Sequence, residues 1–169
     1  MEVKEALQRR RSVRKFTEEP VPEDAVRELL HAAMSGPSAC NRKPWEFWVI
    51  TNAQTLETLR GASRFTNDEA KLAIVVAGNL SRALPRQLAE YWIQDCSAAT
   101  ENILLRATEL GLGAVWCGIY PQKRAEQKVA ELLGMPPEQI PLNILFLGYP
   151  AETPKPRDQY EESYIHWVK

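Results

Sequence analysis

The apolar positions of the chain alternate between helical spacing and short unbroken runs. Val3, Ala6, Leu7 and Arg10 follow helical spacing, which predicts a short first helix that ends near Arg11.

A second helix is expected to begin at Pro22-Glu23-Asp24 and to stop at Gly36-Pro37. Proline is tolerated in the first turn of a helix, and acidic side chains there interact favourably with the positive end of the helix dipole. Residues at helical spacing give this helix one apolar face: Val26, Leu29, Leu30, Ala33 and Met34.

Four other segments have the composition of strands. Residues 45–51 (WEFWVIT) are rich in aromatic and β-branched side chains. Residues 72–77 are continuously apolar, as expected of a strand that is covered on both faces. Residues 142–147 (LNILFL) predict the last strand, and residues 114–118 predict a short strand or turn.

Further helices are expected between these strands. Leu56 and Leu59 indicate a short helix, and residues 124–133 indicate another. Residues 91–110 predict a long helix that Gly111 ends. One stripe along the long helix is apolar: Ala99, Ile103, Ala107 and Leu110. Helices and strands thus alternate without an internal repeat or a linker, which predicts one α/β-type layered domain, a sheet covered by helices.

The composition is that of a globular protein. The 169 residues are 44% hydrophobic, enough for one domain with a core. Lys plus Arg (21) and Asp plus Glu (22) give a net charge of -1, which argues against a wholly basic nucleic-acid binder but is compatible with a local basic patch. The longest apolar run, residues 72–77, falls far short of the ~20 residues of a membrane helix, and the N-terminus lacks the pattern of a signal peptide.

The cysteines and histidines predict neither a disulfide framework nor a zinc site. Cys40, Cys96 and Cys117 are odd in number and form no C-x-x-C pair, and His31 and His166 lie far apart in the sequence. Thiols in a reducing cytoplasm are therefore expected.

Four segments have residues that suit ligand binding. The first, the opening segment (residues 9–16, RRRSVRKF), has five cations and one hydroxyl at the end of the first helix. A phosphate requires several N–H and O–H donors and positive charge, and arginine supplies forked, charge-assisted hydrogen bonds. A solvated basic face and a nucleic-acid-binding arm are the alternatives for this segment.

The second segment, residues 36–45 (GPSACNRKPW), lies between a helix and a strand. Its small residues leave room for a flat ring, and Ser38 and Asn41 can hydrogen-bond to a polar ring edge. An ordinary loop bounded by Pro37 and Pro44 is the alternative.

The third segment, residues 111–118 (GLGAVWCG), departs from the dinucleotide-binding pattern G-x-G-x-x-G. Trp116 stands where the third glycine is required, and the segment follows a helix rather than a strand. What remains is Gly118 in a strand-end turn, where the backbone can approach a ligand closely.

The fourth, the exit segment (residues 148–157, GYPAETPKPR), leaves the last predicted strand. Its prolines favour an extended course that presents Lys155 and Arg157, and an ordinary surface loop is the alternative. The tail after Pro156 is expected to pack on its own chain or on a partner, because it contains several large apolar residues: Tyr160, Tyr164, Ile165, Trp167 and Val168.

Taken in order, the four segments resemble the compact form of the FMN-dependent nitroreductase family. The matching patterns are R-R-S-[VI]-R-x-F, P-S-x-x-N-x-x-P-W, L-G-L-G-x-x-W-x-G and G-Y-P-x-E-x-P-x-P-R, and they span nearly the whole chain. The resemblance implies a single FMN-binding domain over residues 1–169, an α/β (α+β) layered sandwich in which helices flank a mostly antiparallel or mixed sheet. It also implies a homodimer with tightly bound FMN at the interface, in which the tail, residues 156–169, wraps the partner.

The resemblance also implies roles for individual residues around FMN. The opening and exit segments would hold its phosphate and ribityl chain through Arg10, Arg11, Ser12, Arg14, Lys155 and Arg157. Arg14 would also reach the pyrimidine edge of the flavin, where a positive group stabilises the reduced, anionic ring. The second segment would line the ring and its partner surface through Pro37, Ser38, Ala39 and Asn41. The Cys117–Gly118 backbone would face the flavin N5 edge.

Two further features concern the ring edge. Lys43 stands where the family usually has glutamine, so one ring-edge hydrogen bond of the family is not assured. Asn67 and Lys71 are additional candidates for the pyrimidine edge.

The implied activity is that of an NAD(P)H-dependent FMN oxidoreductase. In a ping-pong cycle NAD(P)H would reduce FMN and leave, and a nitroaromatic, a quinone or a similar small-molecule acceptor would then be reduced at the same face. The flavin carries the hydride chemistry, so no side chain is named as nucleophile, acid or base, and no metal, nucleic acid or membrane is expected as a partner.

Two alternatives stay open at this point. A non-enzymatic nucleic-acid or partner-binding domain would use the basic stretch Arg9–Lys15, and salt-sensitive retention on DNA would support it. A family member with bound flavin could instead serve a narrower reaction, such as dehalogenation or ring cleavage.

Overall fold

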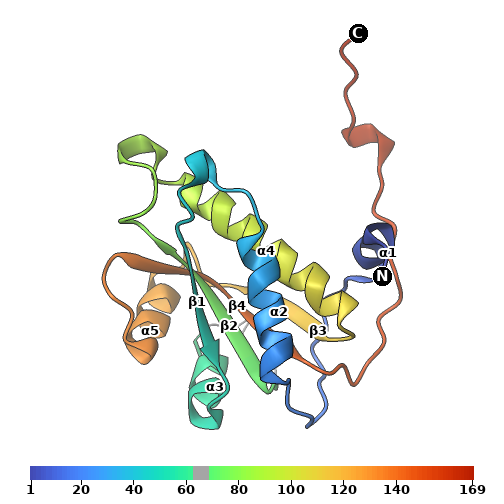
Figure 1. Ribbon diagram of the computed structural model, residues 1–169, viewed down its shortest axis with the longest axis horizontal. Coiled ribbons are helices and arrows are strands. Elements are labelled where there is room, and N and C mark those ends of the chain that lie inside the picture. Colours follow the sequence, from blue (N-terminus) through green and yellow to red (C-terminus); the bar gives the residue numbers. More distant parts are fainter. Residues whose placement is uncertain (63–68) are drawn as a thin grey trace.

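A computed structural model describes residues 1–62 and 69–169, which form three layers around an antiparallel sheet (Figure 1). The sheet has four strands in the order β1-β2-β4-β3: β1 (Trp45–Ile50), β2 (Leu72–Asn79), β3 (Gly113–Gly118) and β4 (Gln139–Gly148). Five α-helices are present in the described residues: α1 (Val3–Arg9), α2 (Glu23–Met34), α3 (Ala53–Arg60), α4 (Tyr91–Glu109) and α5 (Lys123–Leu133). Short 3-10 turns occur at Ala39–Asn41, Arg86–Leu88 and Glu162–Tyr164. None of the helices described is both long and apolar enough to cross a membrane.

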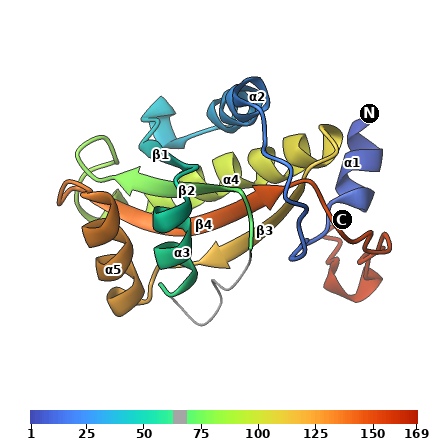
Figure 2. The same cartoon turned by 90° about the horizontal axis from the view of Figure 1, so that it is seen from below.

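The central strands β2 and β4 are covered on both faces. Every residue of β2 is buried, and the strand pairs antiparallel with β4 along its whole length. Leu72, Ile74 and Val76 face the core that α2 and α4 cover, whereas Ala73 and Val75 face the core beneath α3 and α5. Figure 2 shows the two helix pairs on opposite sides of the sheet. The unbroken apolar run of β2 follows from this arrangement, because alternate side chains enter different cores.

The predicted fold class is confirmed, and each predicted element is present to within a few residues of its ends. One boundary differs for a tertiary reason. The first helix ends at Arg9 and not near Arg11, because the next residues extend along the sheet and Ser12 pairs with Ala114.

Met34 was expected on the buried face of the second helix and is instead exposed. It is the last residue of α2, and the buried face consists of Val26, Leu29 and Ala33, which pack towards α4 and the sheet.

A glycine in β2 allows α4 to approach the sheet closely. A Cβ atom on Gly78 would lie 2.2 Å from Cε3 of Trp92, a residue of the first turn of α4. Trp92 in turn packs edge-on against Tyr120, with ring centroids 5.1 Å apart. The indole therefore occupies the space that a side chain at position 78 would need.

Gly78→Ala is expected to lower the free energy of unfolding by about 1–3 kcal/mol, since the added methyl group overpacks a rigid aromatic contact. Equilibrium urea unfolding measures this change. Gly61→Ala serves as the control, because a Cβ atom there would be 3.7 Å from the nearest heavy atom, in ordinary contact. Equal stabilities of the two variants would contradict the packing argument.

Candidate functional site

The opening segment lies between β3 and the chain that leaves β4. Ser12 forms a parallel bridge with Ala114 of β3, and Phe16 forms an antiparallel bridge with Pro150 of the exit segment. The Val13 amide donates a 2.9 Å hydrogen bond to the carbonyl oxygen of Ala114. Two segments far apart in the sequence are thus joined through main-chain contacts.

Two glycines permit this close approach. A Cβ atom on Gly113 would lie 2.7 Å from Cγ1 of Val13, and one on Gly148 would lie 3.1 Å from Cδ1 of Phe16. Gly113 is the first residue of β3 and pairs with Gly148, the last residue of β4. A larger residue at either position would collide with a side chain of the opening segment.

Glu152 fastens the opening segment to the exit segment. Its Oε1 accepts hydrogen bonds from the backbone amides of Arg14, at 2.9 Å, and Lys15, at 3.3 Å. The bond from the Arg14 amide is the main reason why the pKa of Glu152 lies below its ordinary value. The ionised carboxylate thus holds the two segments together.

A hollow of about 410 Å³ opens beside this junction, between the end of α1, the end of α4 and the exit segment. Arg9, Arg11, Thr108 and Pro156 are among the residues that line it. The Nε atom of Arg11 is buried and has no hydrogen-bond partner within the described residues. A buried guanidinium donor without a partner is costly unless a ligand or water satisfies it.

Arg10, the residue after α1, faces Glu101 in the middle of α4. Its Nε is 3.8 Å from a carboxylate oxygen of Glu101, a long ion pair. Burial raises the pKa of Glu101, and the Arg10 charge partly offsets that effect. The guanidinium of Arg10 is thus held only loosely by its own chain.

At the other end of β3 there is space beside Gly118, whose carbonyl oxygen accepts a 3.2 Å hydrogen bond from Gln122 Nε2. Cys117 is buried, but a Cβ atom on Gly118 would meet nothing within 4 Å. The neighbouring Trp116 is 37% exposed on this edge strand. A flat ligand can therefore approach the main chain at Gly118.

The second segment forms a loop of unusual backbone conformation. Cys40, Asn41 and Lys43 have φ angles of 49°, 54° and 50°, in the left-handed region. The Ser38 hydroxyl oxygen accepts a 3.0 Å hydrogen bond from the Lys43 amide and closes the loop internally. Ser38 and Ala39 are half-buried, whereas Pro37 and Asn41 are exposed.

The structure brings most but not all of the predicted site residues together. The opening segment, β3 and the exit segment share one edge of the sheet. The 37–43 loop leads into β1 at the opposite edge, and two strands separate β1 from β3. Since neighbouring strands are ~4.8 Å apart, about 14 Å of sheet lies between the two groups. Within one chain the two groups therefore lie at opposite edges of the sheet.

The comparisons with known proteins assign this arrangement to a family. The model of the nitroreductase family matches residues 7–71 and 63–149. A protein of Methanothermobacter thermautotrophicus named "Putative NADH dehydrogenase/NAD(P)H nitroreductase" is 40% identical over 171 residues, which cover 100% of this chain and 88% of that protein. The chain belongs to the nitroreductase family.

Solved structures of nitroreductase-type proteins share the fold. A protein of the same name from Parabacteroides distasonis has a TM-score of 0.93 at 35% identity, and the match covers 99% of this chain and 98% of the other. An FMN-dependent nitroreductase from Clostridium difficile has a TM-score of 0.88 at 27% identity, covering 97% and 98% of the two chains. The chain is thus an oxidoreductase of this family, as its motifs predicted.

The remaining residues considered for the ligand site of this nitroreductase differ in their surroundings. Lys71 pairs with Glu18 at 2.5 Å, and Asn67 lies outside the described residues. Of the aromatic residues near the segments, Trp45 and Trp92 belong to the core, whereas Tyr91 and Trp116 are exposed.

The C-terminal tail does not pack on its own chain. Its large side chains are exposed: Tyr160, Tyr164, Ile165, Trp167 and Val168. Of the two expectations for the tail, packing on its own chain is therefore wrong, because the tail runs away from the layered body (Figure 1).

Two residues that shape the site have roles that the sequence did not predict. Glu152 is part of the G-Y-P-x-E pattern, but its bond to the opening segment spans 138 positions. Asp95 of α4 accepts a hydrogen bond from the Ala39 amide across 56 positions. Local spacing gives no signal for either contact.

The stability that the Glu152 contact provides should depend on pH. The folded-state pKa is lowered, so the contribution is complete above the ordinary glutamate pKa of ~4.3 and is lost as the pH falls through the lowered value. Thermal unfolding of Glu152→Gln and the wild type should therefore differ at pH 7 and converge in acid. A difference that stays constant down to pH ~2 would contradict this assignment.

Proposed function

We propose that this chain is an NAD(P)H-dependent FMN oxidoreductase that binds FMN along β3. The observation that carries the proposal is the junction of the opening segment with β3 and the exit segment, which gathers cations and open main chain at one sheet edge. The name of the Clostridium difficile structure supports the choice of cofactor.

The residues present fit a phosphate at the junction. The net charge of the chain is -1, yet no ion pair joins Arg11, Lys155 or Arg157 to another described residue. Clustered cations repel one another unless an anion neutralises them. A phosphate would supply acceptors for Arg10, Arg11, Ser12, Lys155 and Arg157, and each charge-assisted hydrogen bond is worth roughly 1.5–3 kcal/mol.

The residues also fit a ring at the far end of β3. Ser12 lies beside Ala114, and Gly118 follows Ala114 by four residue steps along the strand, a span of ~13 Å. That span suits a ribityl chain followed by a flat ring. The Cys117–Gly118 backbone would then lie at N5, and Arg14 at the pyrimidine edge, where its charge would stabilise the reduced, anionic ring.

A second copy of the chain would complete the site. Pro37, Ser38, Ala39 and Asn41 lie at the opposite edge of the sheet, so the partner would contribute this loop to the ring. The exposed tail suits the same arrangement, since its aromatic side chains would find apolar surface on the partner. We therefore propose a homodimer with two FMN sites at its interface.

When bound, FMN would supply the hydride chemistry of a ping-pong cycle from NAD(P)H to a nitroaromatic, a quinone or a similar acceptor. The chain itself would bind and orient the cofactor and leave one ring face open to both substrates in turn. No side chain is assigned as acid, base or nucleophile. We place the enzyme in the cytoplasm, where its cysteines, none of which forms a disulfide, would stay reduced.

The first test is an absorption spectrum of the purified protein, with mass spectrometry of any released chromophore. The expected result is a yellow protein that releases FMN and turns over NADH or NADPH with a quinone. A colourless protein that also fails to bind added FMN would refute the proposal. Salt-sensitive retention on DNA would then favour the nucleic-acid-binding alternative.

Arg157→Ala should weaken FMN binding by about 10–100-fold, because it removes charge-assisted bonds to the phosphate. Fluorescence titration of apoprotein measures this loss. Arg124→Ala on α5 is the matched control, since this exposed arginine lies on the other face of the sheet and should not alter the affinity. Equal affinity of Arg157→Ala and wild type would remove Arg157 from the site.

Mixing two defective variants tests the shared site. Arg157→Ala changes the exit segment, and Asn41→Ala changes the 37–43 loop, which each chain would contribute to the site of its partner. Refolding them together should create heterodimers in which one site has neither substitution, so that FMN sites of wild-type affinity reappear. If no such sites reappear, each site draws on a single chain.

A further inference from the structure

Asp95 is a buried carboxylate that the proposed chemistry does not use. It lies in α4, is 6% exposed, and its Oδ1 accepts a 2.8 Å hydrogen bond from the backbone amide of Ala39. Ala39 is the first residue of a 3-10 turn, and its amide has no partner within that turn. A side chain from a distant helix thus caps the start of the 37–43 loop.

The capped loop has a backbone that requires support. Its left-handed residues, Cys40, Asn41 and Lys43, each add conformational strain, and such strain persists only where surrounding contacts over-determine the conformation. The bond between the Ser38 hydroxyl and the Lys43 amide closes the loop but does not attach it to the rest of the fold. Asp95 provides that attachment at the beginning of the loop.

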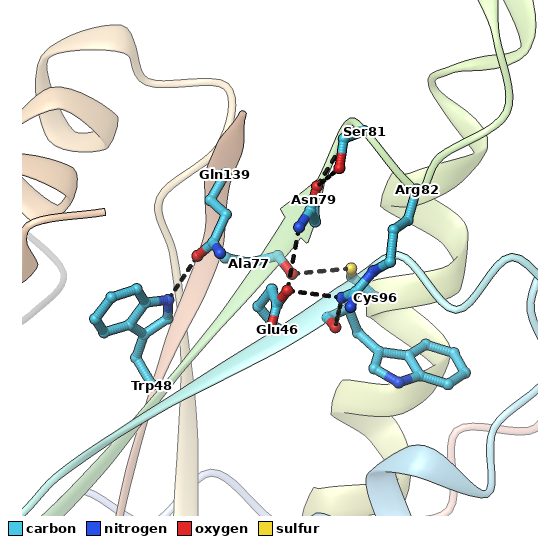
Figure 3. A network of polar contacts seen from close by, with 9 residues as sticks. Glu46, Trp48, Ala77, Asn79, Ser81, Arg82, Cys96 and Gln139 are labelled. Carbon is cyan, nitrogen blue, oxygen red and sulfur yellow. Dashed lines mark hydrogen bonds and ion pairs between the residues drawn. The ribbon is translucent and has the colours of Figure 1, made fainter. Parts of the chain in front are cut away.

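A second group of contacts holds the far end of the loop. The Arg42 Nε donates a 2.9 Å hydrogen bond to the Arg82 carbonyl oxygen. The Arg82 guanidinium in turn binds Glu46 at 2.8 Å and the Trp45 carbonyl oxygen at 2.7 Å, and Asn79 donates to the same Glu46 oxygen (Figure 3). Residues 40 and 41 are therefore exposed, and the residues on either side of them, Ala39 and Arg42, are held by hydrogen bonds.

A contribution to folding stability does not by itself explain why a carboxylate is buried at position 95. Burying a charge is costly, and no ion pair to Asp95 is present among the described residues. Burial chiefly raises the pKa of the neighbouring Cys96 to about 12; the charge of Asp95 adds to this effect, and the charge of Arg82 partly offsets it. A group retained at such a cost suits a role in binding.

We infer that Asp95 is a positioning residue for FMN: through the Ala39 amide it holds the 37–43 loop in the conformation that receives the flavin ring of the partner's site. The inference rests on the proposed function and extends it to a residue that touches no ligand. A loop that is already ordered loses less conformational entropy when the cofactor binds, so the affinity rises without a new contact.

The test compares three variants as apoproteins. Asp95→Ala removes the acceptor, Asp95→Asn keeps a carbonyl oxygen at the same position, and Cys96→Ala changes the adjacent buried residue, whose thiol faces the Ala77 carbonyl in β2 (Figure 3). FMN affinity is measured by fluorescence titration, and protection of the Ala39 amide is measured by hydrogen exchange without cofactor.

Asp95→Ala should bind FMN about tenfold more weakly and lose the protection of the Ala39 amide. Asp95→Asn should stay close to the wild type in both measurements, and Cys96→Ala should keep its FMN affinity even if its melting temperature falls.

Several outcomes would overturn the inference. These are wild-type affinity in folded Asp95→Ala, equal losses in Asp95→Asn and Asp95→Ala, and an equal loss in Cys96→Ala, which would indicate general weakening of α4. Should Asp95→Ala fail to fold, an unprotected Ala39 amide in the wild type or a weakened Asp95→Asn would still refute it. Absence of FMN binding in the wild type would instead refute the proposed function.

Discussion

The antiparallel pairing of β2 with β4 is the constraint on which the other elements depend. Both strands are buried along most of their length, so each of their faces must be covered by helices. Helices α2 and α4 cover one face and α3 and α5 the other, which leaves only the edge strands β1 and β3 accessible. Among the described strands, a ligand that needs main-chain contacts with the sheet can therefore approach at these edges.

The two edges are used differently. At β3 the opening segment adds a short parallel pairing through Ser12, and the exit segment returns beside it, where Glu152 binds the Arg14 amide. At β1 the 37–43 loop precedes the strand. The loop is held by hydrogen bonds to the Asp95 carboxylate and to the Arg82 carbonyl oxygen. In the homodimer proposed above, the β3 edge of one copy would lie near the β1 edge of the other, and the two-fold symmetry would produce two such sites.

The segments of the candidate site were predictable, but their mutual placement was not. Residue type and order singled out the segments that contain Arg10, Arg11, Ser12 and Gly118, because phosphate recognition and close backbone approach demand particular residues; the roles of these residues at FMN stay predictions. Glu152 and Asp95 were missed as contacts, since each is a single acid that binds amides far away in the sequence. Met34 and the end of the first helix were misjudged because helical spacing does not reveal what a helix packs against.

The sequence by itself determined the elements, the layered class and the family, because apolar periodicity and four ordered motifs are local properties of the chain. Only the tertiary structure decided that the opening and exit segments meet at one sheet edge while the 37–43 loop lies at the other. Strand order and the close contacts at Gly113 and Gly148 produce that division. The strand order and these contacts both arise from long-range packing, in which residues distant in sequence fill adjacent volume in a close-packed interior.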